Sequence, residues 1–405
     1  MSARPPLRFL DRTTPPHIVT LVMLAGVSAL NMSIFLPSLN QMAVYFDTEY
    51  AVMQLAVSGY LAATAVLQLF VGPISDRFGR RRVMLAALVL FVLCTIGALL
   101  AQSVTAFLIF RIGQAVVATG MVLSRAIVRD MVPQDEAASM IGYVTMGMAL
   151  IPMIGPTIGG VLEQAFSWHA SFVFLAVAGV AVFVLALFDQ GETVKSGGVG
   201  LAEQFKGYPG LLSAPRFWGY SLCAAFGSGA FFAFLGGAPY VAEAVYGLSP
   251  VVTGLAFGAP AIGYALGNFI AGRLSARIGV NRMAFWGNTV AVMGMGLSLA
   301  VTATGFESAL LFFGFCSILG LGNGMMLPNA TAGLLSVRPQ LAGTASGLGG
   351  ALMIGGGAAL SQLAGVVLAG RDTALPLQEL MFASVVLALL SILFVMRREA
   401  RLQAA

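Results

Sequence analysis

Charged residues are scarce in this chain. They make up 9% of its 405 residues, against roughly 25% in an ordinary soluble protein. Apolar residues fill 59% of the positions, so a soluble fold could not cover its surface, and most of that surface must face lipid. Disorder is excluded by the same figures, because it requires low hydrophobicity and high charge. The composition predicts an integral membrane protein.

The sequence also lacks the patterns on which common enzymatic and cofactor sites depend. No GxGxxG, Walker lysine or HExxH motif is present, and the three cysteines form no CxxC pair. The net charge of +5 is spread over short loops rather than one basic face, which argues against nucleic acid as a partner. We therefore expect no enzymatic activity, no metal and no cofactor.

Long apolar runs dominate what is present. A helix needs about 20 apolar residues to span a bilayer, and twelve runs meet that length. The first follows three arginines but is too long for a signal peptide. The expected spans are 18–37, 50–71, 83–102, 104–124, 138–162, 168–188, 216–238, 250–271, 283–304, 308–328, 343–369 and 378–396.

The basic residues alternate between the two sides of these spans. With both termini placed in the cytoplasm, every lysine and arginine except Arg111 and Arg371 falls in a cytoplasmic segment. A wrong number of spans would scramble this asymmetry. The distribution therefore predicts cytoplasmic termini.

The two halves of the chain resemble each other. Several residues of 72–82 recur at 272–282, two hundred positions later, and the Met-Ile-Gly of 153–155 recurs at the same offset. The longest loop, 189–215, lies between two blocks of six spans. We predict six-helix bundles at 1–188 and 216–405, a cytoplasmic linker at 189–215, and a ligand site between the bundles near the midplane.

The segment 72–82 is a basic loop bounded by glycines. Glycine permits a tight turn, and an aspartate there can accept hydrogen bonds from arginines. The segment resembles the loop between helices 2 and 3 of the major facilitator superfamily, which implies a latch that holds the cytoplasmic side closed in one state. A loop that only sets topology is the alternative. The matching residues are Gly72, Asp76, Arg77, Gly79, Arg80 and Arg81.

Arg111 lies inside the fourth span, about 10 Å from its outer end, and Gln114 follows on the same helix face. A charge within a span is costly and usually faces the protein interior, although an arginine near an interface can also snorkel. Antiporters of this superfamily carry an arginine here that is associated with proton coupling. The resemblance therefore implies proton coupling or substrate binding for Arg111 and Gln114.

The fifth span carries an ordered series of prolines and glycines. The prolines bend the helix, and the glycines allow close backbone contact. The series resembles the antiporter signature of drug-exporting members, which implies exchange rather than symport. Its positions are Gly147, Gly155, Pro156, Gly159 and Gly160.

Two further stretches, 33–39 and 125–130, resemble the bicyclomycin-resistance (Bcr/CflA) drug exporters. One departure matters: many of these relatives have an aspartate at the position of Ser33, and no carboxylate lies deep in any expected span. Other polar residues of the spans could line a substrate cavity or simply bond neighbouring helices. These candidates are Asn31, Ser33, Tyr264, Asn268 and Asn323.

The superfamily resemblance covers nearly the whole chain. It implies an all-α membrane protein with twelve helices in the major facilitator fold, in a bacterial inner membrane. We expect a monomeric multidrug exporter that exchanges protons for small lipophilic compounds, with the proton gradient as its energy source. Two alternatives stay open: a dedicated metabolite exporter or uniporter, and a transport-inactive receptor that binds ligand.

Overall fold

The computed structural model describes residues 8–132, 154–193, 208–338 and 341–404, and the single positions 140, 144 and 151. Eleven helical segments of these residues are long and apolar enough to cross a membrane. Residues 154–165 are also helical and belong to the run expected at 138–162, most of which lies outside the described residues. The elements are α1 (Ile18–Ser33), η1 (Leu36–Ser38), α2 (Leu39–Tyr45), α3 (Tyr50–Met53), α4 (Leu55–Phe78), α5 (Arg80–Leu99), α6 (Val104–Gly113), η2 (Gln114–Val117), α7 (Ala118–Met131), α9 (Trp168–Asp189), α11 (Tyr208–Leu212), α12 (Pro215–Tyr240), η3 (Val241–Val245), α13 (Pro250–Ala256), α14 (Gly258–Ile278), α15 (Val280–Ala303), α16 (Ala309–Ser336), α17 (Ala342–Leu368) and α18 (Leu375–Ala404).

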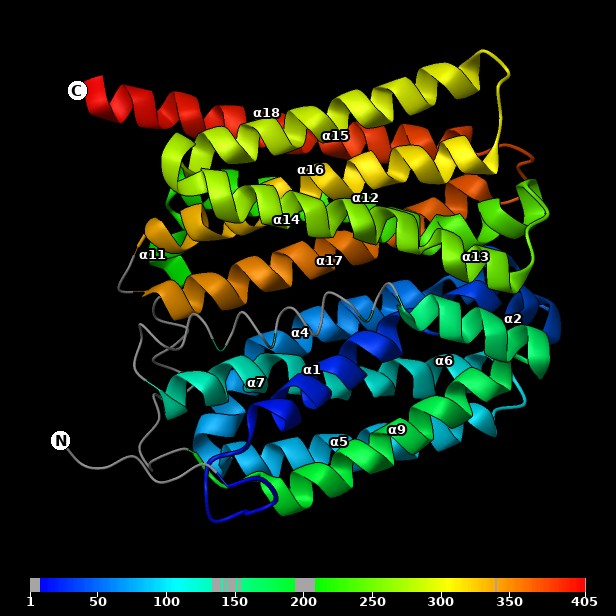
Figure 1. The fold of residues 1–405 in the computed structure, drawn as a ribbon, viewed down its shortest axis with the longest axis vertical. Coiled ribbons are helices and arrows are strands. Elements are labelled where there is room, and N and C mark those ends of the chain that lie inside the picture. Colours follow the sequence, from blue (N-terminus) through cyan, green and yellow to red (C-terminus); the bar gives the residue numbers. More distant parts are fainter. Residues whose placement is uncertain are drawn as a thin grey trace.

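The helices form two bundles that lie side by side (Figure 1). Helices α1 to α9 build one bundle, called the N half below, and α12 to α18 build the other, called the C half. Helices α4 and α17 contact each other across the boundary. The short helix α11 lies within the linker expected at 189–215, and residues 194–207 of that linker fall outside the described residues. The limits of the two bundles therefore stay a prediction.

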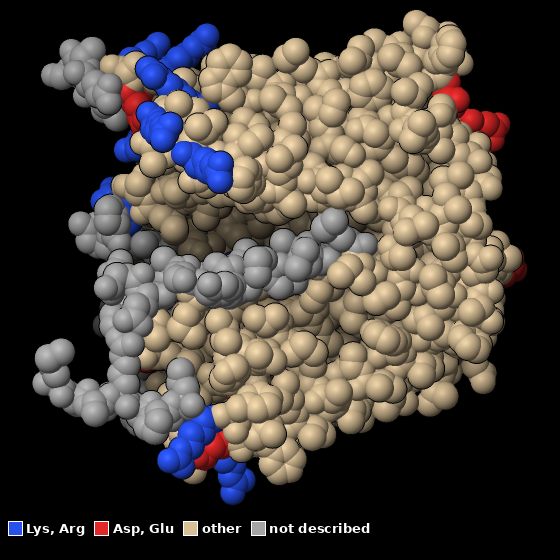
Figure 2. Space-filling model, viewed as in Figure 1, with Lys and Arg blue, Asp and Glu red and all other residues tan. Residues whose placement is uncertain are grey.

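Charge separates the two ends of the molecule. Lysines and arginines gather at the end where α1 begins and α18 stops, on the left of Figure 2. We call this the basic end, and the other the opposite end. The band between them is apolar, and large side chains such as Leu93, Val177 and Met293 are 59%, 64% and 68% exposed there. An apolar belt of this kind fits contact with lipid tails.

The repeat of the sequence is visible as a repeated turn. Gly79 separates α4 from α5 with φ of +95°, and Gly279 separates α14 from α15 with φ of +89°. Each glycine N–H donates to the carbonyl of a serine four residues earlier, at 2.9 Å in both cases. Only glycine adopts such a φ freely. Both halves thus use the same one-residue reversal at the basic end.

Candidate functional site

Arg111 is held at the centre of the N half. Its side chain is fully buried where α6 gives way to the 3-10 turn η2. Nη1 donates to Asn31 Oδ1 at 2.7 Å and to Gln114 Oε1 at 2.6 Å. Nη2 donates to the Asn31 carbonyl at 2.8 Å, and Nε donates to the Ala56 carbonyl at 3.0 Å. Arg111 therefore joins α1 and α4 to the fourth span.

The surroundings of Arg111 are neutral. Its guanidinium lies 4.2 Å from the ring centre of Phe35 and 4.4 Å from that of Tyr60, in cation–π contact with both. Gln114 Nε2 in turn donates to Thr95 Oγ1 of α5 at 2.7 Å. All these partners belong to the N half, and among the described residues no carboxylate pairs with this cation. The geometry is that of a buried clamp inside one bundle.

The basic loop is bonded to its own half. Arg80 Nη1 lies 2.6 Å from Asp76 Oδ1, and Nε donates to Asp130 Oδ2 at 3.1 Å. The backbone N–H of Arg80 donates to Glu192 Oε1 at 2.8 Å. Asp130 ends the fourth span and Glu192 follows the sixth, so one arginine connects three spans.

The rest of the loop also faces the N half. Arg81 Nη2 donates to the Leu187 carbonyl of α9 at 3.0 Å, and the Arg77 guanidinium lies 5.4 Å from the ring centre of Phe78. Among the described residues, the hydrogen bonds and ion pairs of this loop all stay in the N half. In this conformation the loop therefore makes no such bond to the described residues of the C half, as a latch between the halves would.

The C half repeats this arrangement with different side chains. Glu399, near the end of α18, pairs with Arg216 at the start of α12. It also accepts a hydrogen bond from Asn281 Nδ2, and Tyr220 donates to Asn281 Oδ1 at 2.7 Å. Asn281 stands two hundred positions after Arg81. A carboxylate near the end of the last helix of each half, Glu192 just after α9 and Glu399 within α18, thus holds the matching turn of that half.

Hydrogen bonds join the two halves near the opposite end. They run from α3 and α4 of the N half to α12 and α17 of the C half. Because polar side chains of a span are costly unless they are paired, bonds of this kind specify which surfaces meet. The pairs are Tyr50–Gly236, Gln54–Ser361, Ser58–Gln362 and Ala51–Gln362, at 2.7, 2.8, 2.6 and 3.1 Å.

The glycine-rich helix completes this closure. A Cβ atom added at Gly160 would overlap the carbonyl of Pro250, and one added at Gly254 would overlap the carbonyl of Pro156. Thr157 Oγ1 also donates to the Gly254 carbonyl at 3.2 Å. The helix 154–165 and α13 therefore cross at backbone contact, each through a glycine. Any larger residue would hold the halves apart.

Two other residues of the glycine series pack within the N half. A Cβ atom at Gly159 would fall on the Ile34 carbonyl, and one at Gly155 would meet the hydroxyl of Ser33. Ser33 itself is buried and donates to the carbonyl of Ala29 at 3.2 Å. Gly147 lies outside the described residues.

At the basic end the halves part. Figure 2 shows a hollow between them, running in from that end. A Cβ atom added at Gly72, Gly272 or Gly347 would meet none of the described residues within 4 Å.

The remaining polar candidates lie in the C half. Asn268 Nδ2 donates to the Tyr264 carbonyl at 2.9 Å, and both residues are partly exposed on α14. Tyr264 lies within electrostatic range of Arg125 of the N half, across the boundary between the halves. Asn323 is buried against Gly227, inside the C half.

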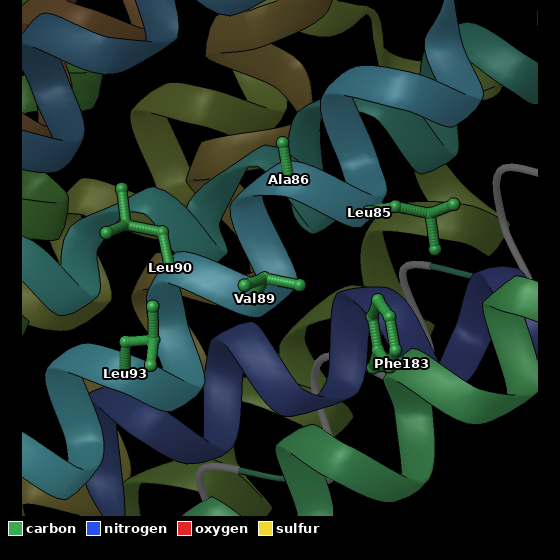
Figure 3. Close-up of a pocket in the computed structure, with 6 residues that line it drawn as sticks. All are labelled: Leu85, Ala86, Val89, Leu90, Leu93 and Phe183. Atoms are coloured by element: carbon green, nitrogen blue, oxygen red, sulfur yellow. The ribbon is translucent and has the colours of Figure 1, made fainter.

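A further depression on the surface is unrelated to this site. It lies between α5 and α9 on the outside of the N half, and only apolar side chains line it (Figure 3). Such a groove fits a lipid chain rather than a selective site. Its lining residues are Leu85, Ala86, Val89, Leu90, Leu93 and Phe183.

Several residues that make these contacts were not predicted from the sequence. Gln54 and Ser361 are 307 positions apart, so no local pattern connects them. The contact of Glu192 with the basic loop could have been suspected, because an acidic residue directly after a span lies on the same side of the membrane as that loop. Thr95 resembles any other polar residue of a span.

Two repeated helical bundles, joined at one end and parted at the other, have the architecture of a secondary membrane transporter. The sequence model of the Major Facilitator Superfamily matches residues 21–362, and the chain belongs to that family. It is therefore a multi-pass, all-helical membrane transporter rather than an enzyme, as the sequence predicts.

Relatives in bacteria resemble most of the chain. An uncharacterized MFS-type transporter, YdgK of Bacillus subtilis, is 30% identical over 91% of this chain and 92% of its own length. Multidrug resistance protein D of Escherichia coli is 28% identical, over 86% and 88%. The chloramphenicol resistance protein of Pseudomonas aeruginosa is 30% identical, over 81% and 79%.

The fold matches solved structures as well. A bacterial homolog of the human lysosomal transporter Spinster, crystallised in an inward-facing and occupied conformation, superposes with a TM-score of 0.72. The match covers 95% of this chain and 96% of that one, at 17% sequence identity. At that identity the likeness concerns the fold alone.

Proposed function

We propose that this protein exports small lipophilic compounds by alternating access, with protons moving in exchange. The observation that carries the proposal is the asymmetry of the interface between the halves. Hydrogen bonds such as Gln54–Ser361 join them near the opposite end. Near the basic end a hollow lies between them, and none of the described residues lies within 4 Å of a Cβ added at Gly72 or Gly272. A transporter needs two such states, each closed on one side.

The orientation follows from charge. Basic residues favour the cytoplasmic side of a membrane, so we place the basic end and both termini in the cytoplasm. The conformation described here is then open to the cytoplasm, and it is the state that takes up a compound for export. Tyr264 and Asn268 are the substrate contacts we propose first, because they lie at the boundary between the halves.

The class of substrate is supported by two observations. Relatives along most of the chain carry names such as multidrug resistance protein and chloramphenicol resistance protein. The glycine series that resembles the antiporter signature also lies at the closure, where Gly160 meets Pro250. A dedicated metabolite exporter or uniporter would share this fold and differ only in substrate or coupling.

Transport in proteoliposomes tests the proposal. Purified protein is reconstituted into vesicles with an acidic interior, and uptake of chloramphenicol, bicyclomycin and a panel of lipophilic dyes is measured. We expect uptake of at least one compound that collapses when a protonophore dissipates the gradient. Uptake that ignores the gradient would support a uniporter. Binding without uptake would indicate a receptor.

A further inference from the structure

Two carboxylates meet at the boundary of the halves near the opposite end. Glu163 follows Gly160 by one helical turn, on the helix that crosses α13. Glu243 belongs to the C half and lies in η3, a π-helical turn at the end of the seventh span. Both lie beside α13, because Gly160 meets the carbonyl of Pro250 and η3 contacts α13. At this separation the charge of one carboxylate acts on the other. Local π-helical turns often occur at functional positions.

Neither carboxylate is fully satisfied. One oxygen of Glu163 and one of Glu243 are shielded from solvent and accept no hydrogen bond from the described residues. Ser38 of η1 is completely buried and directs its hydroxyl toward Glu163. The side chain of Asn40 faces Glu243. The site thus combines carboxylate oxygens that accept no hydrogen bond with a buried hydroxyl beside one of them.

The neighbouring groups do not neutralise the pair. Tyr50 of α3 lies within electrostatic range of both Glu243 and Tyr240 of α12, and the two tyrosines are uncharged phenols near neutral pH. Helix α13 packs against η3 and has no ionisable side chain. No positively charged group among the described residues acts on Glu163 or Glu243. Like charges placed together without a cation oppose simultaneous ionisation.

We propose that Glu163 and Glu243 are the proton-binding residues of this transporter and share a proton when the opposite end is closed. With both carboxylates ionised, repulsion opposes the approach of the two halves. One proton, taken from water, removes a charge and provides a hydrogen-bond donor for a shielded oxygen. Parting of the halves solvates both groups and releases the proton.

The inference rests on the proposed proton-coupled transport and deepens it. Ser33 stands where related exporters have a buried aspartate, and it is occupied by a bond to its own helix. Glu163 and Glu243 provide carboxylates near the opposite end of the molecule, in place of the buried aspartate that related exporters have in the first span. Because each half contributes one of them, protonation is linked directly to the distance between the halves.

Distances between spin labels test this proposal in the intact protein. Cysteines are placed at Val44 and Ala303, which are exposed on the two halves near the opposite end, and the three native cysteines are replaced by alanine. Double electron–electron resonance is recorded without drug or gradient at about pH 5.5 and about pH 8.5. We expect the ratio of closed to open molecules to fall about tenfold at the higher pH.

The glutamine variants identify the groups responsible. The double variant Glu163→Gln with Glu243→Gln should stay closed at both pH values. Each single variant also lacks the pair of like charges, so it should stay closed at both pH values as well, with a smaller change to the protein. Glu49→Gln, an exposed acid near the same end, should respond as the wild type does. An unchanged distance distribution in the wild type, or an unchanged response in the glutamine variants, would overturn the proposal.

The outcome is separate from that of the transport assay. A pH-dependent closure in a protein that exports nothing would support the proton site and refute the proposed function. Proton-driven export with a closure that ignores pH would do the reverse.

Discussion

Gln54 Nε2 lies 2.8 Å from Ser361 Oγ and joins the N half, at the junction of α3 and α4, to α17 of the C half. Both side chains are fully buried. Gly236 and Gly365 leave the room that Gln54 occupies, since an added Cβ at either position would meet it. This bond connects two elements that must separate if the opposite end is to open.

Removal of this bond should favour the open state. Gln54→Ala together with Ser361→Ala deletes donor and acceptor, and a buried hydrogen bond contributes about 1 kcal/mol. We expect about a fivefold fall in the ratio of closed to open molecules, measured with the spin labels at Val44 and Ala303. Ser391→Ala removes only a bond within α18 and should leave the ratio unchanged. Equal distributions in both variants would contradict the role given to Gln54.

The contribution of Gln54 shows where sequence reasoning stops. Arg111 is recognisable because a charge within a span is rare, and Gln114 because it follows on the same face. Asn31, the other side chain that binds Arg111, was predicted only as a general cavity candidate. Contacts between distant spans depend on helix packing, which no short sequence pattern determines. The closure therefore had to come from the structure.

Gly160→Leu should block the conformation described here. The added side chain would meet the carbonyl of Pro250, and overpacking of this kind costs about 1–3 kcal/mol. We expect an outward-open population that rises about tenfold or more, and transport that falls in proportion. The outward-open population is measured by labelling a cysteine near the closure from the external side, and transport is measured by vesicle uptake. A closed, active variant would show that the crossing with α13 is dispensable.

Gly72→Leu should destabilise the state in which the basic end is closed. An added Cβ would meet none of the described residues within 4 Å there, so the variant should fold and bind ligand as the wild type does. Closure of the basic end would bring another helix against the new side chain, and we expect transport to fall about tenfold. Ligand affinity and uptake are measured on the same preparation. Wild-type uptake would mean that the halves never close on Gly72.

Arg111→Gln should destabilise the N half. The variant leaves the Asn31 and Ala56 carbonyls without their donor, at a cost of about 1–3 kcal/mol each. We expect an apparent melting temperature about 5 °C lower in detergent, whereas Arg371→Gln, at an exposed position, should melt as the wild type does. An unchanged melting temperature with abolished transport would instead indicate that Arg111 acts on the proton or the substrate.

The fold was more accessible to prediction than the site. Long apolar runs locate the spans because the bilayer imposes a minimum length, but they miss the polar ends of the helices. The run expected at 216–238 continues as helix to Val245, and the turn that holds Glu243 lies in that extension. Polar residues at a span end lower its hydropathy, so the residues near a gate are those that the apolar pattern excludes.

Distances recorded at both ends of one protein test the central claim, alternating access, most directly. Val44 and Ala303 report on the opposite end, and cysteines at Arg82 and Arg282, both exposed, report on the basic end. Each pair is measured with and without an exported compound and at two pH values. The account predicts that the basic end narrows whenever the opposite end widens. Movement of one end alone, or widening of both together, would contradict it.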